Sequence, residues 1–263
     1  MRRRLDVELV RRGFTESRAR AVEAIEAGRV LVGNGPVTSP ARQVGDDEAI
    51  VLTGAPPPFV SRGGEKLDAA VDEFAIDPAG LRTLDAGAST GGFTDCLLQR
   101  GATHVTAVDV GRGQLDWRLR EDPRVTVLER CNVRHLEPEQ IGGHVAFAVA
   151  DLSFISLLTV APALARCTTT DAELVLLVKP QFEAGRGRVG RRGVVRDPSV
   201  HRDVLARVAD GLDAGGLPVV AAVVSPLVGP EGNREFFFLV RRGEIAQVPA
   251  VLADVADVAG ESS

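Results

Sequence analysis

Short apolar runs alternate with segments of helical period over most of the chain after Arg82. The apolar runs predict strands at Thr83–Ala86, His104–Asp109, Val125–Leu128, Val145–Asp151, Leu174–Lys179, Pro218–Val224 and Phe236–Val240. The helical periods between them predict helices at Phe93–Arg100, Gln114–Arg120, Ile155–Ala165 and Ser199–Gly211. Apolar strands separated by helices are typical of an α/β fold with a mostly parallel, doubly wound sheet. Ligands of such sheets bind beyond the carboxyl ends of the strands, where the strand order switches.

The N-terminal segment follows a different pattern. Two helices and two strands are predicted there, at Leu5–Arg12, Arg18–Glu26, Val30–Val32 and Ala49–Leu52. Ser17 is a good N-cap for the second helix, and Gly13 and Gly28 end the two helices. Residues 33–35, Gly-Asn-Gly, predict a turn between extended segments. We therefore expect a small α+β domain.

These patterns predict four parts of the chain. Residues 1–53 form the small domain, and 54–60 form a linker that three consecutive prolines stiffen. Residues 61–245 form the α/β domain, which begins with a helical period at Lys66–Phe74, and residues 246–263 form a tail.

The composition is that of a globular protein, with 44% hydrophobic and 25% charged residues in a chain of 263. Cys96, Cys131 and Cys167 have neither metal-ligand spacing nor the even number of a disulfide framework, so we expect no metal site and a reducing compartment. No apolar segment follows the basic start, and Asp151 interrupts the apolar run Val145–Ala165. We expect a cytoplasmic protein without a membrane segment.

The positive charges are unevenly distributed. The net charge is −5, yet residues 1–45 hold nine arginines against five acids, and residues 185–196 hold a second arginine group. Such patches on an acidic chain indicate a local site for a polyanion, although solvated surface is the alternative.

The first of these patches resembles a known RNA-binding domain. The run Ser17-Arg18-Ala19-Arg20-Ala21, followed by Ile25, Gly28, Val30, Val32, Asn34, Gly35 and Pro40, is similar to the S4-type domain of ribosomal proteins and RNA-modifying enzymes. In that family the second helix and the following hairpin face RNA. A helical hairpin that only packs on its neighbour is the alternative. Our candidate RNA-binding residues are Arg4, Arg11, Arg18, Arg20, Arg29, Arg62, Arg186, Arg188, Arg191 and Arg192.

Lysine is rare in this chain. Of 31 basic side chains only Lys66 and Lys179 are lysines. Burial can lower the pKa of a lysine until it is a neutral base, whereas arginine stays charged. The two lysines therefore indicate chemistry that a guanidinium cannot perform, unless they are chance residues of a biased composition.

A glycine-rich loop follows the first predicted strand of the α/β domain. It reads Asp85-Ala86-Gly87-Ala88-Ser89-Thr90-Gly91-Gly92-Phe93, a spacing that differs from the dinucleotide motif G-x-G-x-x-G. An acid in the loop suits the cationic amino-acid end of a ligand better than a pyrophosphate. Asp109, after the second strand, suits ribose hydroxyls, and Asn132, after the third, suits an adenine edge. These residues resemble the S-adenosylmethionine site of class I methyltransferases; NAD binding or an empty turn are the alternatives.

Four charged residues are candidates for the reaction centre. Asp151 and Lys179 end two strands that we expect to be neighbours, and Lys66 and Glu235 complete the set Lys66-Asp151-Lys179-Glu235. In order and spacing the set resembles the tetrad of FtsJ-like ribose 2′-O-methyltransferases. A ribose hydroxyl must lose its proton as it attacks, and Lys179 is the candidate base. Salt bridges that merely close the edge of the sheet are the alternative.

The motifs occur together in one order. The S4-like segment, the linker, residues 61–67 (Ser-Arg-Gly-Gly-Glu-Lys-Leu), the loop above, 151–156 (Asp-Leu-Ser-Phe-Ile-Ser) and 179–183 (Lys-Pro-Gln-Phe-Glu) resemble the TlyA family over almost the whole chain. The resemblance implies a methyltransferase that acts on cytidine 2′-hydroxyls of 23S and in some members also 16S rRNA in the ribosomal subunits, and that sensitises bacteria to capreomycin and viomycin. The sequence shows no sign of an obligate protein partner, and we expect none. The family also carries the name haemolysin, so a cytotoxin and a catalytically idle RNA-binding protein remain as alternatives.

Overall fold

The computed structural model describes residues 2–15, 17–33, 35–54, 57–185, 187–190, 193–229 and 231–247. Several predictions concern residues outside these ranges: Asn34 of the turn, residues 55 and 56 of the linker, Arg186, Arg191 and Arg192, and the tail from residue 248. The chain divides into two compact units, Met1–Pro57 and Pro58–Ser263. In the described part of the chain no helix has the length and apolar composition needed to cross a membrane.

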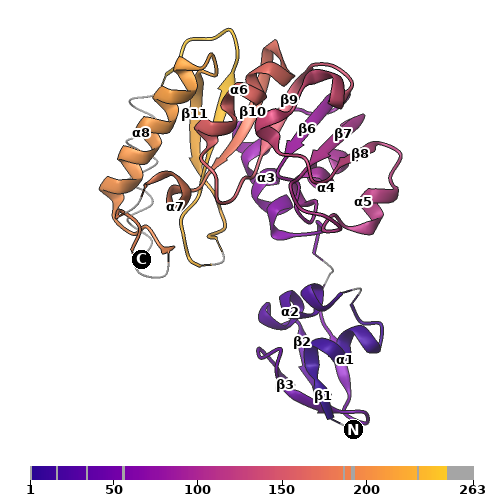
Figure 1. The fold of residues 1–263 in the computed structure, drawn as a ribbon. Coiled ribbons are helices and arrows are strands. Elements are labelled where there is room, and N and C mark those ends of the chain that lie inside the picture. Colours follow the sequence, from indigo (N-terminus) through magenta and orange to yellow (C-terminus); the bar gives the residue numbers. More distant parts are fainter. Residues whose placement is uncertain are drawn as a thin grey trace. The chain divides into compact units, whose positions relative to one another are not determined.

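The first unit is a small α+β fold (Figure 1). Its elements are β1 (Arg2–Arg4), α1 (Leu5–Arg11), α2 (Arg18–Glu26), β2 (Val30–Val32), β3 (Gly35–Pro36), β4 (Gln43–Gly45) and β5 (Ile50–Leu52). The three short strands β3, β2 and β5 form one antiparallel sheet, and β1 pairs with β4. Ser17 caps α2, because its Oγ accepts a hydrogen bond from the Arg20 N–H at 3.3 Å. Apolar side chains of both helices, such as Leu9 and Ile25, pack on those of β2.

The second unit is built on a seven-stranded sheet (Figure 1). Its strands are β6 (Arg82–Ala86), β7 (His104–Val108), β8 (Val125–Leu128), β9 (Val145–Ala150), β10 (Thr168–Val178), β11 (Val219–Val224) and β12 (Phe236–Arg241). They lie in the order β11-β12-β10-β9-β6-β7-β8. Only β12 runs antiparallel to its neighbours, so the predicted mostly parallel, doubly wound sheet is confirmed.

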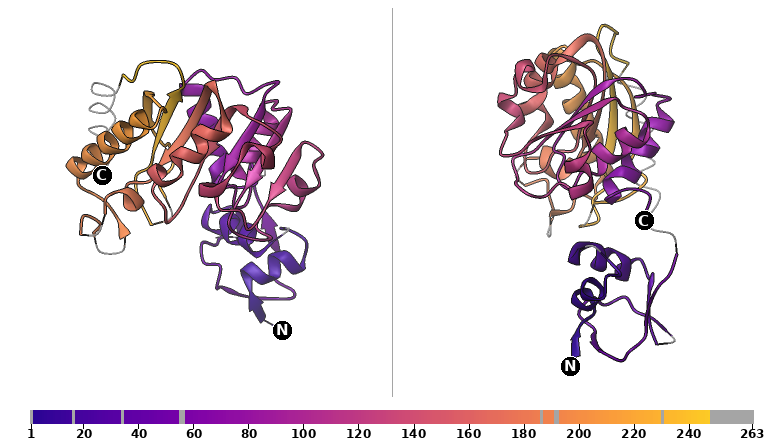
Figure 2. Two further views of the ribbon diagram at one scale, coloured as in Figure 1. Left: turned by 45° about the horizontal axis from the view of Figure 1, so that its top comes forward. Right: turned by 90° about the vertical axis from the view of Figure 1, so that its right-hand side faces the viewer.

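Helices cover both faces of this sheet (Figures 1 and 2). The α-helices are α3 (Arg62–Glu73), α4 (Gly92–Gln99), α5 (Trp117–Glu121), α6 (Leu157–Cys167), α7 (Pro180–Glu183) and α8 (Pro198–Ala214), with 3-10 turns η1 (Val133–His135) and η2 (Pro138–Ile141). Strand side chains alternate between two cores: Leu176 and Phe238 face α6 and α8, whereas Leu177 and Phe237 face α3 and α4. Burial on both faces explains why the strands are almost continuously apolar.

Strand β4 of the first unit was not predicted, and two further strand predictions were incomplete. The β10 strand begins at Thr168 instead of Leu174, because its first part is a polar Thr-Thr-Thr-Asp run joined to the rest by a register shift. The strand β1, made of three arginines, has no apolar pattern and was missed.

Candidate functional site

The loop after β6 lies at the carboxyl edge of the sheet, where the strand order changes direction. The N–H groups of Gly87 and Ala88 donate to the Val108 carbonyl at 2.8 and 3.1 Å, which ties the loop to β7. Gly87 has a φ of +91°, and a Cβ atom there would lie 2.3 Å from the Asp151 carbonyl oxygen. Glycine is therefore required at this point by both backbone conformation and space.

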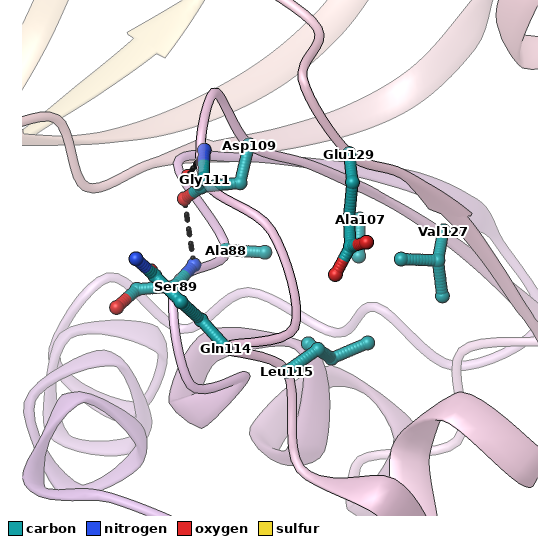
Figure 3. A pocket seen from close by; sticks show the side chains of 9 residues that line it. All are labelled: Ala88, Ser89, Ala107, Asp109, Gly111, Gln114, Leu115, Val127 and Glu129. Atoms are coloured by element: carbon teal, nitrogen blue, oxygen red, sulfur yellow. Dashed lines mark hydrogen bonds between the residues drawn. The ribbon is translucent and has the colours of Figure 1, made fainter.

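Asp109 joins this loop to the next one. Its carboxylate accepts hydrogen bonds from the N–H groups of Ser89 at 2.8 Å and Gly111 at 2.6 Å, as Figure 3 shows. A small cavity of about 10 Å³ adjoins Asp109, and Ala88 and Glu129 are among the side chains that line it (Figure 3). Main-chain N–H groups therefore hold the Asp109 carboxylate beside the glycine-rich loop.

A larger cavity of about 500 Å³ opens at the same edge. Of the predicted residues, Gly87, Ser89, Asp109, Asn132 and Asp151 line it. The sequence analysis did not assign the other lining residues to the site, although four of them belong to the segment 151–156; they are Val110, Gln114, Val133, Leu152, Ser153, Phe154, Ile155 and Val160. Most of them follow strands β7, β8 and β9 directly, so the rule that ligands bind after strand ends was the signal available.

The remaining loop residues have other surroundings. Thr90, Gly91, Gly92 and Phe93 line neither of these cavities. A Cβ on Gly91 would lie 2.3 Å from Leu119 Cδ1, and one on Gly92 would lie 2.8 Å from the Gly64 nitrogen. These two glycines thus allow close packing of α4 on its neighbours.

Asp85 lies beneath the loop and is fully buried. Its Oδ2 accepts a hydrogen bond from the Thr94 hydroxyl at 2.7 Å, while its Oδ1 has no hydrogen-bond partner among the described residues. Burial raises the pKa of Asp85 to about 7, and the nearby carboxylates of Asp151 and Asp109 act in the same direction. A buried, unpartnered carboxylate oxygen suits a cationic group of a ligand.

The four predicted catalytic residues form two ion pairs. Lys179 Nζ pairs with Asp151 and donates to the Ser153 hydroxyl at 3.1 Å. Lys66 Nζ lies 2.5 Å from Glu235 Oε2, and both side chains are buried.

The sheet register brings the two pairs to one edge. Val178 lies opposite Phe236 in the β10–β12 ladder, so Lys179 and Glu235 are each one step beyond that last pair. Asp151 follows β9, which neighbours β10 on the other side, as predicted from strand adjacency. Lys66 reaches Glu235 from α3, which precedes the sheet in the chain.

Two aromatic side chains follow the residues of the Asp151–Lys179 pair in the chain. Phe154 and Phe182 each come three residues after Asp151 and Lys179, respectively, and their ring centroids are 5.0 Å apart. Phe154 is 90% exposed and has a φ of +63°, an unfavourable conformation for a side chain of this size. Glu183 fixes the end of this loop, because it accepts hydrogen bonds from the Ser156 hydroxyl and the Leu157 N–H, each at 2.7 Å.

The predicted RNA-binding arginines of the first unit are partly held by acids. Arg4 and Arg18 bind Asp6, with Nη2 and Nε at 2.9 and 2.8 Å, respectively, from its Oδ2. Arg11 binds Glu8. The other two predicted residues are Arg20, which pairs with Glu23 at 2.9 Å, and Arg29, which follows α2.

The predicted arginines of the second unit are spread over separate elements. Arg62 is exposed at the first position of α3, and no described residue forms an ion pair with it. Arg188 pairs with Asp203 of α8 at 2.5 Å. Among the residues with described positions, no group of three or more His, Cys, Asp or Glu side chains could hold a metal ion.

Comparison with known proteins gives two family matches. Residues 59–242 match the FtsJ-like methyltransferase family, and residues 3–50 match the S4 domain. A 16S/23S rRNA (cytidine-2′-O)-methyltransferase TlyA from Mycobacterium tuberculosis is 54% identical over 91% of this chain and 90% of that protein. Hemolysin A from Brachyspira hyodysenteriae is 40% identical over 89% of this chain and 97% of that protein.

A solved structure shares the fold. It comes from Streptococcus thermophilus, carries a provisional hemolysin name, and is 39% identical with a TM-score of 0.80 over 98% of this chain and 95% of that one. The FtsJ-like family matches most of the chain, and the TlyA protein from Mycobacterium tuberculosis matches 91% of it. The chain therefore belongs to the FtsJ-like methyltransferases and, among them, to the TlyA family that its motifs predicted.

Proposed function

We propose that this protein is a ribosomal RNA methyltransferase that uses S-adenosylmethionine to methylate the ribose 2′-hydroxyl of a cytidine, in 23S and also 16S rRNA. The observation that carries the proposal is the pairing of the chain's only two lysines with carboxylates at the carboxyl edge of the sheet, next to a ligand-sized cavity. The relative from Mycobacterium tuberculosis supports the nucleotide and both subunits. Its expected location is the cytoplasm.

The residues around the large cavity fit S-adenosylmethionine. Asp109 offers a carboxylate to ribose hydroxyls, and Asn132 offers an amide to an adenine edge. Val110 and Val133 add apolar surface for a base. Asp85 does not line this cavity but lies in β6 just before the loop, and its buried oxygen, which has no partner among the described residues, suits the ammonium group. When bound, this cofactor supplies a methyl group on a sulfonium, which is already reactive.

Lys179 is the proposed proton acceptor. Its ammonium group is held by Asp151 and Ser153, two neighbours that fix the position of Nζ at the cavity edge. Loss of one proton to solvent would leave a neutral amine that accepts the 2′-hydroxyl proton as the hydroxyl oxygen attacks. Asp151 and Glu235 would orient the two lysines.

The exposed ring of Phe154 suits the base of the target nucleotide. A base stacks on an exposed aromatic side chain with little dependence on sequence, and stacking contributes roughly 1–3 kcal/mol per base. Phe182 supports the ring from its other side, and Glu183 fixes the loop that carries it. Phe154 therefore would hold the nucleotide while Lys179 acts on its ribose.

The test is transfer of a radiolabelled methyl group to unmodified 30S and 50S subunits, assayed separately, followed by nucleoside analysis. The expected result is label in 2′-O-methylcytidine from both particles. Label in a base instead of a ribose would contradict the proposed chemistry, and label in one particle only would restrict the substrate to that subunit. Purified protein added to erythrocytes in parallel tests the cytotoxin alternative, and we expect no lysis.

A further inference from the structure

Two buried carboxylates of helix α1 each bind arginines from this helix and its neighbouring segments. The side chains of Asp6 and Glu8 are almost completely buried, although both lie near the N-terminus of a short surface helix. Buried carboxylates are rare without partners, and here the partners are arginines.

Asp6 holds two arginines that remain open to solvent. It accepts hydrogen bonds from Arg4 Nε at 3.0 Å and Nη2 at 2.9 Å, and from Arg18 Nε at 2.8 Å. The side chains of Arg4 and Arg18 are nevertheless 42% and 61% exposed. Their remaining N–H groups have no partner among the described residues. The carboxylate therefore fixes one side of each guanidinium and leaves the other side free.

Glu8 binds Arg11 and Arg12 in different ways, and Arg3 lies 3.8 Å from its carboxylate. Arg12 binds Glu8 at 2.7 Å and also the carbonyls of Gly45 and Glu48 at 2.8 Å, so it is part of the fold. Arg11 binds Glu8 at 2.7 Å through Nε, and 47% of its side chain is exposed. The arginines hold the pKa of Glu8 to about 2 and lower the pKa of Asp6, so both acids are charged at neutral pH.

A structural role alone does not require this arrangement. One well-bound guanidinium with main-chain partners, as in Arg12, satisfies a buried carboxylate and the fold together. Arg4, Arg18 and Arg11 instead present unused donors to solvent around two acids, which leaves an excess of positive charge. Fixed guanidinium groups with free N–H edges match the paired oxygens of a phosphate.

We propose that Asp6 and Glu8 are positioning residues, which hold Arg4, Arg18 and Arg11 as a preformed set of donors for backbone phosphates of RNA. The inference rests on the proposed function, because it assumes that the substrate is RNA. A long side chain that is already fixed loses less conformational entropy on binding, so the carboxylates raise the affinity although their own charge repels phosphate.

The Asp6 carboxylate positions arginines but also repels phosphate, so the two effects predict opposite results when its charge is removed. Asp6→Asn removes one negative charge, so an account based on charge alone predicts tighter RNA binding. If Asp6 positions Arg4 and Arg18, the variant should bind RNA about tenfold more weakly, because these two long side chains are no longer fixed before binding. The control is Asp47→Asn, because Asp47 is exposed in the same unit, forms no ion pair with any described residue, and the variant makes the same charge change. We expect this control to bind RNA as tightly as wild type or more tightly.

The measurement is the dissociation constant of the full chain for unmodified 50S subunits at several salt concentrations. Thermal unfolding and S-adenosylmethionine binding report whether each variant is folded. Asp6→Glu, which keeps the charge but moves it, provides a second variant and is expected to weaken binding too.

A double-mutant cycle separates positioning from simple folding. If Asp6 acts through Arg18, the loss caused by Asp6→Asn shrinks in an Arg18→Ala background. An undiminished loss in that background, or binding by Asp6→Asn at wild-type strength or better, would overturn the inference. Failure of the wild type to bind ribosomal subunits would overturn the proposed function as well, so the two failures are distinguishable.

Discussion

The two units of this protein pair acids with cations in opposite ways. In the first unit two buried carboxylates each hold more than one arginine, and most of these guanidinium groups are exposed. In the second unit each lysine pairs with a carboxylate of its own, and the lysine side chains are at most 12% exposed.

The difference reflects what each cation must do. A phosphate site needs permanent charge and a fixed fork of donors, which arginine supplies. A cationic side chain that is to accept a proton must first lose its charge, which lysine can do and arginine cannot. In the proposed function, the two rare lysines belong to the reaction centre and the arginines to the binding surface.

The largest effect is expected when one buried pair is broken. Lys66→Met leaves the buried Glu235 without its cationic partner. We expect the free energy of unfolding to fall by roughly 3–5 kcal/mol and the rate of methyl transfer to fall by at least about a hundredfold. Chemical denaturation and methyl-transfer assays measure the two effects.

The double variant Lys66→Met/Glu235→Leu is the control for that experiment. It should regain most of the stability, because two apolar side chains replace the pair, yet remain inactive. Recovery of activity together with stability would mean that the pair only closes the edge of the sheet.

Asp85 is a third case, because it is a buried carboxylate that forms no ion pair with any described residue. Its pKa is raised from an ordinary 3.8 to about 7, so the ionised form, which a cationic ligand favours, gains population as the pH rises from 6 to 8. We expect S-adenosylmethionine affinity to rise by about tenfold over this range. Calorimetry on wild type and Asp85→Asn measures it, and an equally steep pH dependence in the variant would assign the effect to another group.

The smallest effect is expected from exchanging cations in the first unit. Arg18→Lys keeps the charge but loses the planar fork that Asp6 orients, so ribosomal subunits should bind a few-fold more weakly. Filter binding measures this, with Arg42→Lys as the control because Arg42 lies 3.8 Å from the half-exposed Glu48 and touches neither buried acid. Equal losses in the two variants would mean that general charge and not geometry determines affinity.

The sequence predicted the main sheet and the edge at which the site lies. Apolar runs identify strands that are buried on both faces, and strand ends locate Asp151, Lys179 and Asp109. These features depend on local pattern and on a general rule of parallel sheets.

What the sequence did not predict depends on contacts between distant segments. The packing of Gly92 on Gly64 and the exposed ring of Phe154 are fixed by neighbouring elements. The sequence analysis included Asp6 and Glu8 only among the five acids near the N-terminal arginines, because no sequence pattern reveals that their carboxylates are buried.

The most direct test of the central claim is the single-turnover rate of methyl transfer by Lys179→Arg, with S-adenosylmethionine and ribosomal subunits bound. Arginine keeps the charge and the ion pair with Asp151 but cannot accept a proton at neutral pH. We predict cofactor and RNA affinities within about threefold of wild type and a rate reduced by at least about a thousandfold. A rate within about tenfold of wild type would show that Lys179 serves as a salt-bridge partner and not as the base.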